Sequence, residues 1–196
     1  MNKETLLAAV VALVVGLLGG YLVFSISGSK NPAPVGGMPG GGAPMVNYDE
    51  RIAQALKVVA QDPKNLQAWV QLGNDYFDTN QPQKSIEAYG KALEIKPNDP
   101  NILTDQAIMY RAVGWFDKAI ANLEASVKVD PKHVQSLFNL GIIYMEDLKQ
   151  PAKAIQYWTR YLELDPASPN AQRVRMMLEQ AKQVQPSSSA PGPMFR

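Results

Sequence analysis

Apolar residues recur three and four positions apart along the middle of the chain. In the stretches NLQAWVQLGNDYF, which begins at Asn65, and SIEAYGKALEI, which begins at Ser85, they fall on one stripe of an α-helix. A proline follows each pair of such stretches, at Pro97, Pro131 and Pro166. Because proline disfavours helix at the residue before it and has no N–H to continue one, each pair is predicted to end there. The pattern therefore predicts an all-α domain of short paired helices.

The same positions return about every 34 residues. In the first stretch of each pair the recurring set is Leu72, Gly73 and Tyr76, then Gln106, Ala107 and Tyr110, then Leu140, Gly141 and Tyr144. In the second stretch it is Ser85, Tyr89, Ala92 and Pro97, then Ala119, Leu123, Ser126 and Pro131, then Ala154, Trp158, Tyr161 and Pro166. The last set lies one residue late, which we assign to an extra residue in the turn MEDLKQPAK. We expect the small residues to let paired backbones approach closely while larger side chains fill the gaps around them.

These motifs resemble the tetratricopeptide repeat (TPR), a helix-turn-helix unit with the pattern W-x2-L-G-x2-Y, A-x3-F and P. The resemblance covers three units, residues 66–99, 100–133 and 134–168. It implies a TPR α-solenoid, in which further helices shield the ends of the stack. We expect flanking helices at residues 48–62 and 169–184, the second with Ser168 as its cap and Pro169 at its first position. The folded domain would then span residues 47–185.

The N-terminus carries an uncharged apolar run, TLLAAVVALVVGLLGGYLVFSISGS, after a short tail of residues 1–4. At about 1.5 Å per residue this run can cross a hydrocarbon core of about 30 Å, so residues 5–27 are predicted to form a single transmembrane helix. A cleaved signal peptide is the alternative, because residues 25–27 offer a small-x-small site, but the apolar region of a signal peptide is usually shorter. Gly16 and Gly20 form a GxxxG step through which two such helices could pair into a homo-oligomer.

Proline and glycine dominate residues 28–46, and residues 186–196 have a similar composition. The first segment is predicted to be a flexible linker and the second a disordered tail. A short N-terminal tail is expected to stay in the cytoplasm, which would send the repeats to the other side of the membrane. In a Gram-negative bacterium the chain would then be a single-pass inner-membrane protein with its repeats in the periplasm.

Charge and composition exclude several functions. Lys and Arg number 19 against 18 Asp and Glu, so no basic face for nucleic acid is expected. The lack of cysteine excludes disulfides and thiolate catalysis, and the single histidine, His133, has no second histidine to complete a metal site. No nucleotide-binding or nucleophile motif is present in the sequence. We therefore predict no enzyme activity, cofactor or metal, and we expect both His133 and the carboxylates of the first helices, such as Asp105, to be solvated.

In tetratricopeptide proteins the first helix of each unit lines a concave groove, and the resemblance implies the same here. The predicted groove residues are Val70, Asn74, Phe77, Thr104, Ile108, Arg111, Phe138, Asn139, Ile142 and Met145. Some members hold a C-terminal carboxylate in a clamp of lysines, asparagines and an arginine. In this chain Val70 replaces a lysine, Asp105 an asparagine, Gln135 a lysine and Asn139 a basic residue. We therefore expect the groove to take an apolar helix or an extended peptide, with its backbone held by Asn74 and Asn139. The alternative is that several of these residues belong to the core.

Three functions are compatible with this interpretation. The first is a membrane-anchored scaffold that binds a protein or peptide partner in the groove. The second is an assembly factor that holds apocytochrome for haem attachment, because AIQYWTRYLELDPASPNAQRVRMMLEQAK resembles the tetratricopeptide subunits of bacterial cytochrome c maturation. That likeness lies in Ala154, Trp158, Leu162, Pro166 and the closing helix. The third is a structural membrane protein that forms homo-oligomers.

Overall fold

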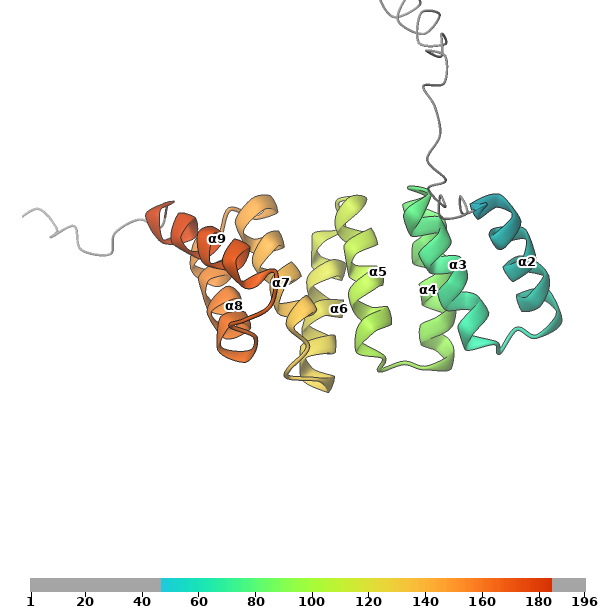
Figure 1. Ribbon diagram of the computed structural model, residues 1–196. Helices are drawn as coiled ribbons and strands as arrows, with labels where there is room; N and C mark the ends of the chain where they lie inside the picture. Colours follow the sequence, from blue (N-terminus) through green and yellow to red (C-terminus); the bar gives the residue numbers. More distant parts are fainter. Residues whose placement is uncertain (1–46, 185–196) are drawn as a thin grey trace, which may run out of the picture. The chain divides into compact units, whose positions relative to one another are not determined.

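A computed structural model describes residues 47–184, and every regular element in that range is helical. The elements in chain order are α2 (Tyr48–Gln61), α3 (Leu66–Asp78), α4 (Pro82–Ile95), α5 (Pro100–Ala112), α6 (Phe116–Val129), α7 (Val134–Ile142), η1 (Ile143–Asp147), α8 (Pro151–Leu164) and α9 (Ala171–Val184). They follow one another in a single row (Figure 1). The predicted all-α solenoid of paired helices is confirmed. Helices α3 and α4, α5 and α6, and α7–η1 and α8 form the three units, and α2 and α9 flank them.

Polar residues and prolines mark the ends of the helices. Asn47, Asn65 and Asp99 accept hydrogen bonds from N–H groups in the first turns of α2, α3 and α5. Helices α4, α5 and α8 begin with a proline, whose missing N–H would have had no partner within the helix. Each second helix ends two residues before the proline that follows its unit; the last helical residues are Ile95, Val129 and Leu164. The prediction that the pairs end at these prolines is therefore confirmed.

Small residues allow the helices of a unit to approach closely. A Cβ atom on Gly73 would overlap the ring of Tyr89, and one on Gly141 would overlap the indole of Trp158. Ser85 Oγ donates a hydrogen bond to the carbonyl oxygen of Gly73 at 2.8 Å, as expected from the facing of these two positions. Each ring thus lies against a backbone that has no side chain in its way.

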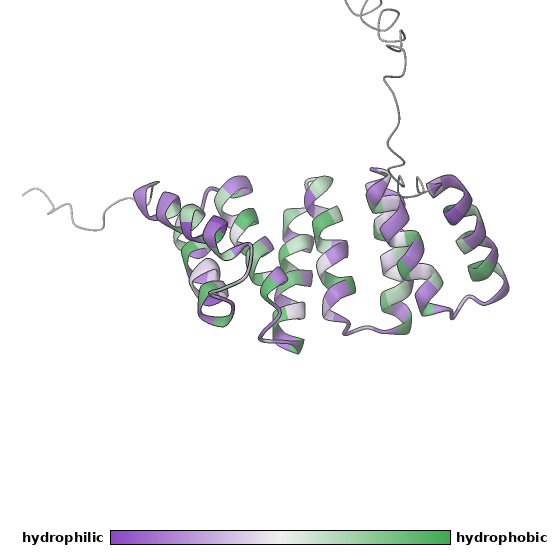
Figure 2. Ribbon diagram, in the orientation of Figure 1, coloured by the Kyte–Doolittle hydropathy of each residue, from purple (hydrophilic) through white to green (hydrophobic). Residues whose placement is uncertain are grey.

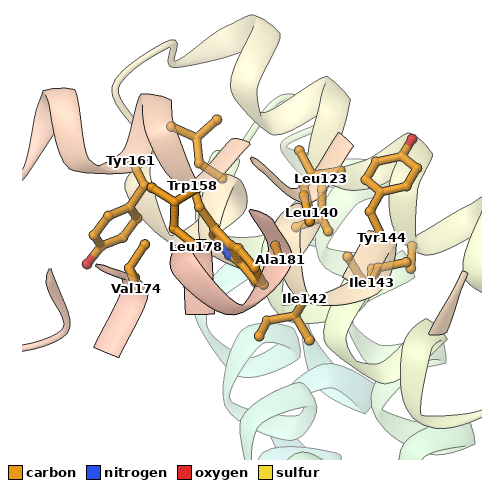
Figure 3. Close-up of a cluster of buried hydrophobic side chains, with 14 residues drawn as sticks. Leu123, Leu140, Ile142, Ile143, Tyr144, Trp158, Tyr161, Val174, Leu178 and Ala181 are labelled. Atoms are coloured by element: carbon orange, nitrogen blue, oxygen red, sulfur yellow. The ribbon is translucent and has the colours of Figure 1, made fainter. Parts of the chain in front are cut away.

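Amphipathic helices bury one stripe each. Figure 2 shows hydrophobic and hydrophilic residues interspersed around every helix. The largest buried cluster lies in the C-terminal half, where Trp158 and Tyr161 of α8 belong to the same core as Val174 and Leu178 of α9 (Figure 3). Helix α9 therefore closes this end of the core with a single apolar stripe.

The extra residue of the third unit lies in a helix and not in the turn, which corrects our interpretation of the sequence. The turns of the three units share one residue with positive φ, namely Asn80 (54°), Gly114 (79°) and Lys149 (54°). This residue comes four positions after Tyr76 and Tyr110, but five after Tyr144. The additional residue is absorbed by η1, a short π-helix. The turn itself keeps the same form in all three units.

Two helix starts differ from the expectation. Helix α9 begins at Ala171, two residues later than predicted, because the Ser168 hydroxyl is 3.0 Å from the Tyr161 hydroxyl and does not cap a helix N–H. His133 precedes α7 but is half-buried, and its Nε2 lies 3.0 Å from Oδ1 of Asn101. Burial lowers the pKa of His133, and the imidazole serves as a hydrogen-bonding residue between Asn101 of α5 and Ser136 of α7.

Several predicted segments lie outside the described residues. They are the tail 1–4, the transmembrane helix 5–27 with Gly16 and Gly20, the linker 28–46 and the tail 186–196. Between residues 47 and 184, no helix is long and apolar enough to cross a bilayer. The expectations for the outer segments stay predictions.

The contact between Gly73 and Tyr89 yields a first prediction. Gly73→Leu forces a side chain into the space of the Tyr89 ring, and such overpacking costs about 1–3 kcal/mol of unfolding free energy. The control is Lys91→Ala, which removes only an exposed ion pair with Glu94 and should change stability by less than about 0.5 kcal/mol. Thermal melts followed by circular dichroism measure both. Equal melting temperatures would contradict the helix pairing described above.

Candidate functional site

A hollow of about 280 Å³ opens where α3, α4 and α5 meet, here termed the first hollow. Its lining residues are Asn74, Phe77, Asp78, Tyr89 and Asp105. The Tyr89 hydroxyl donates a hydrogen bond to Asn74 Oδ1 at 2.7 Å. Burial raises the pKa of Tyr89, so the phenol keeps its proton and holds the Asn74 amide in one orientation. No acceptor within residues 47–184 contacts Asn74 Nδ2, which leaves this donor available to a ligand.

Asp105 brings an unpaired carboxylate to the first hollow. Burial raises its pKa to about 6, and the negative charge of Asp99 adds to the effect. Among residues 47–184, no lysine or arginine lies within ion-pair distance of Asp105. The expectation that Asp105 is solvated was wrong, because the residue is half-buried. The signal in the sequence was its replacement of an asparagine in the carboxylate clamp.

Apolar side chains of α3 and α5 pack around Tyr89, which lines the first hollow. Val70, Phe77 and Ile108 are half-buried and pack against a cluster that includes Tyr89. Three of the predicted groove residues, Asn74, Phe77 and Ile108, are therefore partly accessible to solvent. Contacts with Tyr89 or its cluster hold their side chains in place. The first hollow offers one aromatic ring, one amide and one carboxylate to a ligand.

Arg111 is not available to a ligand carboxylate in this structure. Its guanidinium Nη2 lies 2.7 Å from Glu146 Oε2, and its Nε lies 2.5 Å from Asp147 Oδ2. Both carboxylates come from η1, the π-helix that absorbs the extra residue. Arg111 thereby links the second unit to the third through two ion pairs.

Thr104 and Ile142 do not line a groove, which corrects two of the predicted site residues. Their exposed fractions are 1% and 5%. Thr104 lies one turn before Ala107, on the stripe that faces α6, and its hydroxyl is 2.6 Å from Ser136 Oγ. Ile142 joins the core cluster that also contains Leu178 of α9 (Figure 3). Neighbouring helices cover both Thr104 and Ile142. The sequence of a single helix does not show this packing.

The remaining predicted residues lie near the third unit. Phe138 is half-buried, with its ring 6.3 Å from the ring of Tyr161 and 5.6 Å from the guanidinium of Arg173. Asn139 donates a hydrogen bond to the carbonyl of Gln135 within its own helix, at 2.9 Å. The ten predicted residues thus do not form one continuous set.

Met145 lines a second hollow of about 320 Å³ between η1, α8 and α9. The other lining residues are Glu146, Lys149, Trp158, Arg173, Met177 and Gln180. Arg173, Met177 and Gln180 were missed as site residues because they come from α9, which follows the repeats. Only the folding of α9 back onto α8 brings them beside Met145.

The chemistry of these surfaces is that of recognition by hydrogen bonds and apolar contact. Within residues 47–184, no group of three or more metal-binding side chains comes together. Of the two hollows described so far, the first carries the Asp105 carboxylate and the second is bordered by Arg173 and Lys149.

Relatives with curated names share the repeats over part of their length. The small glutamine-rich tetratricopeptide repeat-containing protein 2 of Mycosarcoma maydis is 29% identical over 120 residues, which is 61% of this chain and 31% of the relative. The cytochrome c-type biogenesis protein CycH of Pseudomonas aeruginosa is 29% identical over 158 residues, which is 74% of this chain and 38% of the relative. The chain therefore spans less than half of the length of these two relatives.

Solved structures share the fold at low identity. MamA is 20% identical with a TM-score of 0.65, and the match covers 70% of this chain and 78% of that chain. The first TPR of Spaghetti (RPAP3), bound to an HSP90 peptide, is 22% identical with a TM-score of 0.55, covering 60% of this chain and 93% of that chain. At these identities the likeness concerns the fold alone.

Two family models described as tetratricopeptide repeat match the chain, one at residues 66–99 and the other at residues 104–169. The matched segments coincide with the three helical units and together take in just over half of the 196 residues. The chain belongs to the tetratricopeptide repeat family.

Proposed function

We propose that this protein is a membrane-tethered scaffold that binds a peptide or helix of a partner protein across its first helices. The observation that carries the proposal is the first hollow, where Asn74, Phe77 and Asp105 present an amide, a ring and an unpaired carboxylate. Ile108 extends the apolar part of this surface. A partner segment that buries Phe77 and Ile108 would also supply hydrogen-bond partners to Asn74 and Asp105.

The charge of the first hollow favours a ligand that donates hydrogen bonds. The fold holds Asp105 half-buried without a cation, at a cost in free energy whenever the carboxylate is ionised. A backbone N–H or a basic side chain of the partner would offset that cost. The domain of Spaghetti (RPAP3), which shares this fold, is bound to an HSP90 peptide. In this chain a carboxylate-directed mode is disfavoured, because Arg111 already bonds Glu146 and Asp147.

The membrane tether rests on the apolar run at residues 5–27. With the linker 28–46, it would hold the repeats near a bilayer, in the periplasm if the source is a Gram-negative bacterium. Tethering restricts the search for a partner to the membrane surface and thereby raises the effective concentration of both molecules.

A second candidate function is the holding of apocytochrome during cytochrome c maturation. The match to CycH of Pseudomonas aeruginosa, named as a cytochrome c-type biogenesis protein, covers 74% of this chain and so reaches beyond the three units. In this candidate the same surface would take an apocytochrome segment as its ligand.

The tether gives a second prediction. The full-length chain should remain in the membrane pellet after carbonate extraction, because the run at residues 5–27 is long and uncharged. Val14→Lys combined with Leu17→Lys should release the chain, since each lysine at the centre of a membrane helix costs about 2.5–3.5 kcal/mol. Val35→Lys in the linker is the control and should stay in the pellet. A soluble mature chain that begins at Gly28 would instead identify a cleaved signal peptide.

The binding surface gives a third prediction. In capture experiments from detergent-solubilised membranes, Phe77→Ala with Ile108→Ala should lose at least tenfold of the bound partner, because removal of buried apolar contacts at the centre of an interface costs about 1.4 kcal/mol or more. Ile95→Ala with Leu164→Ala removes comparable side chains from the second helices and should capture as before. Circular dichroism verifies that all variants are folded. Equal capture by both double variants would place the binding surface elsewhere.

The identity of the captured proteins separates the two candidate functions. Mass spectrometry of proteins whose capture depends on Phe77 and Ile108 should return c-type apocytochromes if the second candidate is correct. Other membrane or periplasmic proteins in their place would support the general scaffold.

Asp105 gives a fourth prediction. Its pKa is raised from 3.8 to about 6 in the folded state, so the folded protein loses stability as pH rises from about 4 through 6. Asp105→Asn should therefore raise the unfolding free energy by about 1 kcal/mol at pH 7.5, a figure reduced for partial solvent screening, and by less at pH 5. Asp117→Asn, at an exposed site, is the control and should change stability little at either pH. Thermal melts at the two pH values measure both variants. Equal changes in melting temperature for Asp105→Asn and Asp117→Asn at pH 7.5 would contradict this account.

A further inference from the structure

The two ends of the helical row are each half of a repeat unit. Pro63 lies 34 residues before Pro97, so α2 corresponds to α4, the second helix of a unit. Helix α9 packs on α8 as the first helix of a following unit would. Within residues 47–184, α2 thus has no first helix before it and α9 has no second helix after it. Figure 1 shows these two helices at opposite ends of the row.

A hollow of about 410 Å³ marks the place of the first helix that α2 lacks. The residues of α2 that line it are Arg51, Gln54, Ala55 and Val58. Counted 34 residues on, these positions are Ser85, Ala88, Tyr89 and Ala92, which are the four buried residues of α4. In the first unit that surface is covered by α3, with Tyr89 against Gly73. The hollow on α2 and α3, here termed the end hollow, therefore lies where a first helix would be seated on α2. At the position of Ser85 it holds Arg51, whose Nη2 lies 2.6 Å from Oδ1 of the buried Asp75.

The chain's own preceding residues are poorly suited to this seat. The segment in register with a first helix is residues 32–44, PAPVGGMPGGGAP. Proline lacks a helix N–H and glycine costs about 1 kcal/mol per residue in a helix interior, so this sequence disfavours a helix. An occupant of the end hollow must come from elsewhere.

Helix α9 presents the complementary surface. Its buried stripe, which includes Val174 and Leu178, packs in the core with α8, and Met176 lies on the opposite side with an exposed fraction of 61%. In the first and third units a glycine of the first helix meets a ring of the second helix. On α2 the position that corresponds to the Tyr89 ring holds a small residue, Ala55. Val58 beside it is 40% exposed. A methionine on an incoming first helix therefore fits the space above Ala55.

The acidic turn at the start of α2 is complementary to one lysine of α9, Lys182, which within its own helix lies 2.7 Å from Glu179. The first turn of α2 contains Asp49 and Glu50, and the last turn of α9 contains Lys182. The two helices of a unit run antiparallel, so the start of one lies beside the end of the other. An α9 seated on α2 would bring Lys182 to the acidic turn.

We propose that α9 of one molecule packs into the end hollow of a second copy, so that two half units join into one composite repeat unit. The contact is head-to-tail and uses different surfaces on the two copies. Each added copy leaves one free α2 end and one free α9 end, so association can continue into longer rows of repeats.

Cysteine cross-linking tests this arrangement, because the natural chain contains no cysteine. Full-length Val58→Cys and Met176→Cys proteins are purified in detergent, mixed, and treated with a short bis-maleimide. The mixture should give a covalent dimer at a yield several times that of a control mixture of Val58→Cys with Ala121→Cys, where Ala121 is exposed on α6. The cross-linked peptides, identified by mass spectrometry, should join residue 58 to residue 176.

Two results would overturn the proposal. One is a dimer yield in the test mixture no higher than in the control mixture. The other is a dominant dimer in Val58→Cys alone, which would indicate a symmetric contact between two α2 ends. Neither result bears on the partner-binding surface at Phe77 and Ile108, so the proposed function is tested separately.

Discussion

The close approach of a ring to a bare helix backbone is the contact on which the rest of this structure depends. Tyr89 lies against Gly73 and Trp158 against Gly141 with no room for a methyl group between them. Because each ring fills the space that a side chain would occupy, it restricts the separation and the rotation of the two helices in the first and third units. That rotation decides which residues of each first helix face the core and which remain accessible to solvent.

The π-helix η1 shows how the solenoid accommodates an insertion. A turn with one more residue would have changed the direction of α8, whereas a widened helical turn keeps the left-handed residue Lys149 in place. The same widening places Glu146 and Asp147 on the guanidinium of Arg111. Arg111, a positive charge on the predicted groove, is thereby converted into a link between the second and third units.

The first and second hollows differ in charge because different helices supply their charged residues. The first hollow is anionic because Asp105 stands without a cation among the described residues, and the second is bordered by Arg173, which only α9 supplies. The surface proposed to bind a partner is therefore formed partly by the repeats and partly by the helix that closes them. At the other end α2 has no such covering helix within residues 47–184, which leaves the end hollow open.

Local sequence determined the fold of this protein, because its contacts are mostly between neighbouring helices of the chain. The apolar stripes, the prolines at Pro97, Pro131 and Pro166 and the small residues at Gly73 and Gly141 were sufficient for the solenoid and its three units. They also placed Asn74, Phe77 and Ile108 on the first helices, where the first hollow lies.

Only the tertiary structure decided which polar and apolar residues remain accessible. Thr104 and Ile142 have the spacing of groove residues, but neighbouring helices bury both. Asp105 reads as a solvated carboxylate, but its place beside Phe77 and Tyr89 withdraws it from water and raises its pKa. Arg111 has the spacing of a groove residue, but η1 brings two carboxylates to its guanidinium. Helical period gives the direction of a side chain from its own axis, whereas exposure depends on what the next helix places opposite it, and that is settled only when the helices pack.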